Sequence, residues 1–253
     1  MGKNEVIMPL MKFGEIDNNG QYDVEVNLNN AGIDISQDIV TRINEGANCE
    51  RAKIKFDSQT MCLTYTSETL VPPPKNIDKN KTKLLFILGN PATHSIENKM
   101  FFFSKSDRVS RHGFWGKLAK NCLLENFKLE TREKEAERRR NLILSGNTNH
   151  KFVIGFTTFY SMPTPTGIKR NKYCDSIGVE KLFTPILEKI QNEEFNRICN
   201  YPFTEGAILI PTIVEAKKYL CSKINKKGVK FWPIRGKRSG WKDLSDLLKK
   251  IKV

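Results

Sequence analysis

Short apolar runs that alternate with helical patterns are the feature that most limits what this chain can fold into. The runs are KLLFILG (83–89), FVIGFTTF (152–159), GAILI (206–210) and VKFW (229–232). Strands that are apolar at nearly every position are typical of a parallel sheet covered on both faces. Segments with helical spacing follow them, at 113–127, 180–191, 214–224 and 241–251. This order predicts an α/β fold with a central parallel four-stranded sheet flanked by helices.

The first 70 residues have a different pattern. Apolar and polar residues alternate in QYDVEVNLNN and in RAKIKFDSQTMCLTYT, which is typical of half-buried strands. Val71-Pro72-Pro73-Pro74-Lys75-Asn76 and the following DKNKTK cannot form a helix or a central strand, so they indicate a linker. We therefore expect a β-rich N-terminal extension with its linker at 1–75 and a main domain at 81–253.

The net charge also differs between the N-terminal extension and the main domain. Residues 1–80 contain 8 basic and 12 acidic side chains, net −4, whereas residues 81–253 contain 34 and 16, net +18. A strongly basic domain suits a polyanionic partner, because each neutralised phosphate releases condensed counterions. Solubility alone is the simpler explanation of the charge. DNA is the partner that we favour.

Cofactors and membranes have no sequence signal. The cysteines at 49, 62, 122, 174, 199 and 221 form no C-x-x-C pair, so we expect free, reduced thiols, no metal and no cofactor. The first 17 residues lack the apolar run of a signal peptide, and no stretch approaches the ~18 apolar residues of a membrane span. We expect a soluble, monomeric, cytoplasmic protein, associated with the nucleoid if it binds DNA.

Three loops of unusual composition follow the predicted strands, and ligands bind beyond the carboxyl ends of such strands. They are GNPATHS (89–95) with MFFFS (100–104), TTFYSMPTPTG (157–167) and WPIRGKRSGW (232–241). ILGNPATHS, followed by RHGFWGKL (111–118), resembles the first motif of the uracil-DNA glycosylase superfamily, particularly its mismatch-specific thymine/uracil branch. The second and third loops resemble the family's proline-containing exit and its DNA-inserting loop. The resemblance covers 81–253.

The resemblance implies roles for residues of the first two loops. Asn90 matches the family's water-positioning residue, although Asn-Pro after a strand is also simply a good turn. Pro91 follows it and belongs to the base-binding set. Phe103 lies 13 residues after Asn90, the separation at which the classical uracil enzymes place the aromatic that stacks on the flipped base. Phe102 is the next candidate, and the FFF run is equally compatible with the core. Thr158 aligns best with the base-reading position.

The third loop has the properties of a DNA probe. We expect Lys237, Arg238 and Ser239 to contact DNA through its phosphates, and Ile234 or Arg235 to enter the space that the base leaves. The last 31 residues contain 11 basic and two acidic side chains, which is also compatible with a solvated basic tail.

Two departures from the family concern the choice of base. The family often has a histidine in its last loop to stabilise the departing base, and this chain has Trp232-Pro233-Ile234-Arg235 there. Many members read uracil with an asparagine, and a threonine hydroxyl cannot make the asparagine's paired donor–acceptor contact. We therefore expect a modified pyrimidine to be a better substrate than uracil.

The three histidines differ in how well their positions suit a catalytic role. His94 follows the first motif, where it can face the pocket as a catalytic donor or serve as a capping or surface residue. His112 precedes the Phe114-Trp115 pair and is expected to orient a helix. For His150, at the start of a predicted strand, nothing indicates a catalytic role. The run Glu137–Arg140 is more typical of a solvated helix face than of a site.

Together these features predict a metal-free, monofunctional DNA glycosylase. It would flip a uracil-like or modified pyrimidine out of DNA and hydrolyse its N-glycosidic bond, leaving an abasic site, in base excision repair or in defence against modified phage DNA. The main alternative is a non-catalytic DNA-binding module with the same fold. A hydrolase of free nucleosides is disfavoured by the net charge of +18 in residues 81–253.

Overall fold

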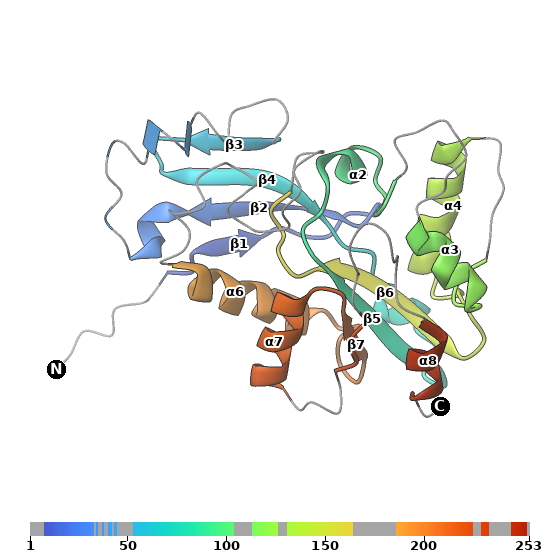
Figure 1. The fold of residues 1–253 in the computed structure, drawn as a ribbon. Helices are drawn as coiled ribbons and strands as arrows, with labels where there is room; N and C mark the ends of the chain where they lie inside the picture. The colour runs from blue at the N-terminus through green and yellow to red at the C-terminus, as the bar shows by residue number, and fades with distance from the viewer. Residues whose placement is uncertain are drawn as a thin grey trace.

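The chain forms two sheets with helices packed around them (Figure 1). The computed structural model describes residues 8–32, 34, 37, 40–41, 43–44, 53–103, 113–125, 131–163, 186–224, 229–232 and 244–251. Its strands are β1 (Met11–Phe13), β2 (Gln21–Asn27), β3 (Ile54–Asp57), β4 (Cys62–Glu68), β5 (Thr82–Leu88), β6 (Phe152–Thr158) and β7 (Ile208–Pro211). Its helices are η1 (Leu28–Ala31), η2 (Pro74–Asn76), α2 (Thr93–Glu97), α3 (Gly113–Lys120), α4 (Arg132–Leu144), α6 (Leu187–Asn200), α7 (Val214–Lys223) and α8 (Leu244–Lys249).

The N-terminal sheet is antiparallel, in the order β1-β2-β4-β3. Its alternating pattern explains its two faces, because Tyr22, Val24 and Val26 of β2 point into the core while Asp23 and Glu25 are exposed. The inner face packs against α6, which lies along the sheet in Figure 1.

The second sheet is parallel, in the order β6-β5-β7. Every residue of β6 is buried, as expected for a strand covered on both faces. Apolar residues of α6 and α7 cover one face, and those of α3, α4 and α8 cover the other. The protein is therefore α/β.

The prediction of a four-stranded parallel sheet is wrong, because the segment 229–232 forms no strand. Val229 makes an isolated parallel bridge with Leu209, and the amides of Lys230 and Trp232 donate to the carbonyls of Leu209 and Pro211. A continued ladder would need the amide of Pro211 to donate back, and proline has no N–H. The fourth segment thus lies beside β7 without becoming a strand.

Several predicted helices have different bounds in the structure. The helix predicted at 113–127 ends at Lys120, where the Asn121 side chain donates to the carbonyl of Lys117 and Cys122 adopts a positive φ of 56°. Residues 126–127 lie outside the described residues. The helix predicted at 180–191 is observed from Leu187 and continues to Asn200, while 180–185 lie outside the described residues. Within the described ranges no helix has the length and apolar character needed to cross a bilayer.

One hydrophobic core reaches from the N-terminal sheet into the parallel sheet. It contains Val24 and Leu63 of the first sheet, Ile190 of α6 and Leu85 and Ile87 of β5. The amides of residues 10 and 11 also donate to the carboxylate of Glu193 on α6. The division of the chain near residues 75–81 stays a prediction, and the apolar packing runs across it.

A buried ion pair lies where the N-terminal sheet, α6 and β6 meet. Nε of Arg197 is 2.8 Å from Oε2 of Glu194, and the two side chains are 3% and 0% exposed. The guanidinium also donates to the Thr157 hydroxyl at 3.1 Å and to the Thr158 carbonyl at 2.6 Å. The ring of Tyr22 lies 5.6 Å from its central carbon. Arg197 therefore fixes the end of β6 to α6.

The carboxylate of Glu194 extends this network into the loop after β6. Its Oε1 accepts hydrogen bonds from the amide and the hydroxyl of Ser161, both at 2.6 Å. The Ser161 hydroxyl also lies 3.0 Å from the Tyr65 hydroxyl of β4. Each charge of the pair is thus satisfied by several partners, as burial requires.

Breaking this pair should be costly. We expect Arg197→Met to lower the free energy of unfolding by about 3–5 kcal/mol, because it leaves the Glu194 carboxylate buried without its counter-charge. Urea denaturation measures this. The matched control is Lys249→Met, which removes an exposed partner of Asp246 at 3.9 Å and should cost about 1 kcal/mol or less. Equal losses in the two variants would contradict the prediction.

A second buried carboxyl, Glu68, makes stability depend on pH. Burial raises the pKa of Glu68 well above its ordinary value of 4.5. The folded state then holds this proton more tightly than the unfolded chain, so its contribution to stability is full below pH 4.5 and falls as pH rises toward the folded-state pKa.

Glu68→Gln should remove this loss of stability with rising pH. We expect the variant to match the natural protein near pH 4 and to exceed it by about 1–3 kcal/mol at pH 8, the range for desolvating an unpaired polar group. Urea midpoints across this range measure the difference. Glu25→Gln, on the exposed face of β2, is the control and should show no such divergence. Parallel curves for Glu68→Gln and the natural protein would contradict the expectation.

Candidate functional site

The carboxyl ends of β5 and β6 bring the first two predicted loops together. The amide of Phe159 donates to the Leu88 carbonyl at 2.9 Å, and that of Tyr160 to the Gly89 carbonyl at 3.4 Å. The two loops therefore leave the sheet side by side, at the edge where parallel sheets bind ligands.

Asn90 is held between these loops. Its Nδ2 donates to the carbonyl of Met162 at 3.0 Å, which fixes the plane of the amide. Its Oδ1 is buried and has no hydrogen-bond partner among the described residues. Pro91 beside it is buried. A fixed acceptor oxygen without a partner is the arrangement needed to hold a water molecule or a ligand N–H.

Thr158 stands at the neighbouring strand end, opposite Leu88 in the register of the sheet. Its side chain is 0% exposed, and its hydroxyl also has no partner in the described part of the chain. Alternation along β6 places Thr157 toward Arg197, so Thr158 faces the opposite side, together with Phe156. The structure thus brings Asn90 and Thr158 to one edge.

Phe102 and Phe103 occupy different positions in the turn after α2. Phe103 is 8% exposed, and the guanidinium of Arg132 lies 5.4 Å from the centre of its ring. Phe102 is half-buried, with its ring 4.3 Å from that of Phe114 and a φ of 52°. A positive φ is strained for a bulky residue, and such strain is concentrated at functional sites. Phe102 is the more accessible of the two for stacking on a base.

His94 lies on α2 and is half-buried. Its Nε2 is 3.1 Å from the carbonyl of Phe103, so the imidazole ties α2 to the turn that carries the two phenylalanines. This contact gives His94 a positioning role, and its catalytic role stays a prediction. His150 is exposed before β6, and His112 lies outside the described residues.

Glu68 is the residue that sequence reasoning missed. The sequence places it in the N-terminal extension, yet it is 2% exposed, and its Oε1 is buried without a hydrogen-bond partner in the described ranges. Its opposite residue on β2 is Gln21, whose Nε2 donates to the Ile96 carbonyl of α2 at 2.6 Å. An acidic residue at the end of an alternating strand, where a polar face is expected, gives no signal of burial.

The predicted DNA-binding residues Ile234, Arg235, Lys237, Arg238 and Ser239 all lie outside the described residues, so their roles stay predictions. The same holds for the second loop beyond Pro163 and for the cysteines at 49 and 174. Cys62, Cys122, Cys199 and Cys221 are free thiols. No group of three or more metal-binding side chains occurs in the described ranges.

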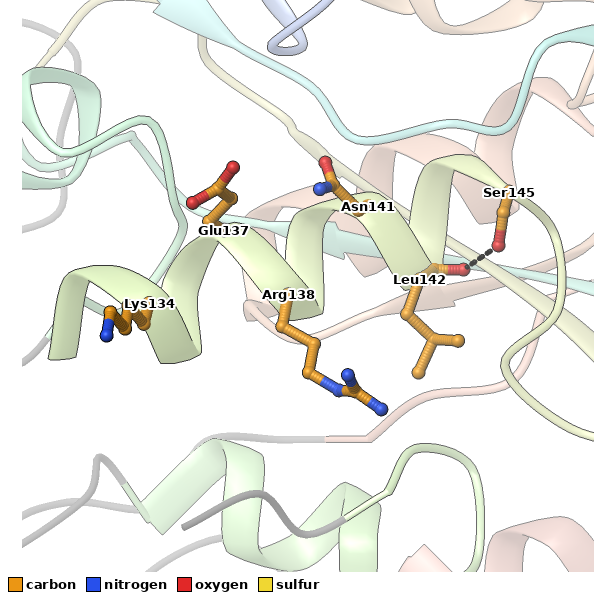
Figure 2. A pocket seen from close by; sticks show the side chains of 6 residues that line it. All are labelled: Lys134, Glu137, Arg138, Asn141, Leu142 and Ser145. Carbon is orange, nitrogen blue, oxygen red and sulfur yellow. Dashed lines mark hydrogen bonds between the residues drawn. The ribbon is translucent and has the colours of Figure 1, made fainter. Parts of the chain in front are cut away.

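A hollow of about 490 Å³ lies on the outer side of α4 (Figure 2). Its lining residues are Lys134, Glu137, Arg138, Asn141, Leu142 and Ser145. The expected solvated face of Glu137–Arg140 is only partly present, because Arg139 points inward, bonds to Glu135 at 3.0 Å and lies over the ring of Trp115. The hollow mixes both charges and has no unpartnered buried group, so the edge at Asn90 is the better candidate site.

Comparison with known proteins adds no relative of this chain. No family model matches it, and neither the curated proteins nor the solved structures include a match.

Proposed function

We propose that this protein is a DNA glycosylase that flips a uracil-like or modified pyrimidine out of DNA and hydrolyses its N-glycosidic bond. The observation that carries the proposal is the amide of Asn90, whose Nδ2 is fixed on the Met162 carbonyl while its buried Oδ1 has no partner among the residues that the structure describes. The net charge of +18 in residues 81–253 favours DNA over free nucleosides as the substrate.

Asn90 would act by positioning water. Its Oδ1 accepts a hydrogen bond from a water molecule, whose oxygen then attacks C1′ of the sugar as the bond from C1′ to the base nitrogen breaks. The electron pair of that bond leaves with the base, which is released after taking up a proton, and the water loses a proton to the solvent. A neutral amide suits this task because the oxocarbenium-like sugar needs an aligned nucleophile more than a strong base.

The aromatic turn would support the flipped base. Stacking on one ring is worth about 1–3 kcal/mol, which offsets part of the few kcal/mol that flipping costs. Phe102 is the accessible ring, and His94 holds this turn through the Phe103 carbonyl.

The test is the release of bases from duplexes that carry uracil, mismatched thymine, hydroxymethylcytosine or its sugar-bearing forms, detected as alkali-sensitive abasic sites. We expect a modified pyrimidine to be released faster than uracil. DNA binding without release from any duplex would favour the non-catalytic binding module instead.

Asn90→Ala should lower the single-turnover rate of base release by about 100-fold or more, because the attacking water loses its alignment. Affinity for DNA should stay nearly unchanged, since Asn90 acts on water and not on the phosphate backbone. Asn121→Ala is the matched control, because that side chain also donates to a backbone carbonyl, at 2.9 Å, but lies at the end of α3. Full activity of Asn90→Ala would remove this residue from the mechanism.

The predicted DNA loop makes a separate prediction. Replacing Lys237 and Arg238 with alanine should weaken binding to all sequences alike and flatten the log–log salt dependence by roughly one to two units. Fluorescence anisotropy at several salt concentrations measures the slope. The control replaces Lys12 and Lys55, exposed on the N-terminal sheet, and should leave the slope intact. An unaltered slope after the Lys237 and Arg238 replacements would exclude them as phosphate contacts.

A further inference from the structure

Glu68 is a buried acid whose position needs an explanation. Leaving a buried polar group without a hydrogen-bond partner is costly, and such groups are rare in folded proteins. Glu68 is 2% exposed, and its Oε1 has no partner in the described part of the chain. A bound ligand with a complementary donor or acceptor would remove this cost.

The position of Glu68 follows from two strand pairings. In the N-terminal sheet it lies opposite Gln21, and opposite residues share a face, so its side chain points to the same side as Gln21, which bonds to α2. Two residues later, Leu70 makes an antiparallel bridge with Phe156 of β6. The bridge is isolated, and in its antiparallel register Glu68 and Thr158 are each two residues away from it.

Two further unpartnered oxygens lie at the carboxyl edge of the parallel sheet. Thr158 is opposite Leu88, and Asn90 is two residues beyond Leu88. The buried Oγ1 of Thr158 and Oδ1 of Asn90 both have no partner among the described residues. Glu68 at the end of β4, Asn90 after β5 and Thr158 at the end of β6 thus each carry one buried oxygen without a partner in the described ranges.

We propose that Glu68 reads the hydrogen-bonding edge of the flipped pyrimidine, with Thr158 beside it, an inference that rests on the proposed glycosylase function. A neutral carboxyl group presents an O–H donor and a carbonyl acceptor side by side, as an amide does. Uracil offers the complementary N3–H and O4, and cytosine offers N3 and its amino group. Glu68 therefore supplies the paired contact that the single hydroxyl of Thr158 lacks.

The charge state of Glu68 fits this role. Burial raises the pKa of its carboxyl well above the ordinary value, which favours the neutral, donating form. No positively charged side chain makes an ion pair with Glu68 in the described part of the chain. Glutamine reproduces the donor and acceptor of the neutral acid, and leucine has a similar size with neither.

The experiment compares Glu68→Gln, Glu68→Leu and the control Glu25→Gln in base release and in DNA binding. We expect Glu68→Leu to lower the release rate at least about 10-fold and to change the relative rates among the bases, whereas Glu68→Gln stays close to the natural protein. Binding to a duplex with an abasic-site analogue should be equal in all variants, because that duplex has no base to read. A merely structural role would weaken both kinds of binding alike.

Two further measurements keep the outcomes distinct. If Glu68→Leu does not fold, Thr158→Val removes the neighbouring hydroxyl at similar size and should also change the relative rates. Base release by Glu68→Leu or Thr158→Val with unchanged relative rates would overturn the inference and leave the proposed function standing. If the folded natural protein releases no base, the proposed function fails. In that case, saturation-transfer NMR with free uracil and cytosine tests the base site directly. Binding of either base by the natural protein that is lost in Glu68→Leu would support the inference. No binding of either base by the natural protein would overturn it.

Discussion

Arg197 and Glu194 form an ion pair that is almost completely buried, and the candidate site is built outward from it. A buried charge is tolerated only when it is paired and hydrogen-bonded, so the two side chains also bond to groups of β6, of the loop after it and of the end of α6. Arg197 holds the end of β6, and Glu194 holds the amide and hydroxyl of Ser161. The next residue along the chain is Met162, whose carbonyl fixes Asn90. A continuous series of polar contacts thus connects α6 with the proposed water-positioning amide.

The N-terminal sheet takes part in this arrangement. Tyr65 of β4 lies against Ser161, and Tyr22 of β2 lies against the guanidinium of Arg197. Burial raises the pKa of Tyr22, so its phenol stays protonated beside the cation. The first sheet therefore supports the loop after β6, and the bridge from Leu70 to Phe156 also joins the N-terminal part of the chain to β6.

The two faces of β6 have different roles, one in the buried polar network and the other in the candidate site. The Thr157 hydroxyl accepts a hydrogen bond from Arg197, whereas Thr158 points away and its hydroxyl has no partner in the described part of the chain. A shift of one residue in the register of β6 would exchange these roles, because neighbouring side chains in a strand lie on opposite faces. The pairing of Leu88 with Thr158 along β5 thus decides which threonine belongs to the candidate site.

The sequence by itself determined the α/β class, most of the strands, including the one that carries Thr158, and the loop that carries Asn90, because apolar periodicity records which local faces are buried. It could not show that the segment 229–232 stays outside the sheet, since that depends on the amide that Pro211 lacks where the segment meets β7. Nor could it show that Glu68 is buried two residues before the bridge that joins Leu70 to Phe156 of β6. That placement comes from pairings between segments far apart in the chain, which only the tertiary structure brings together.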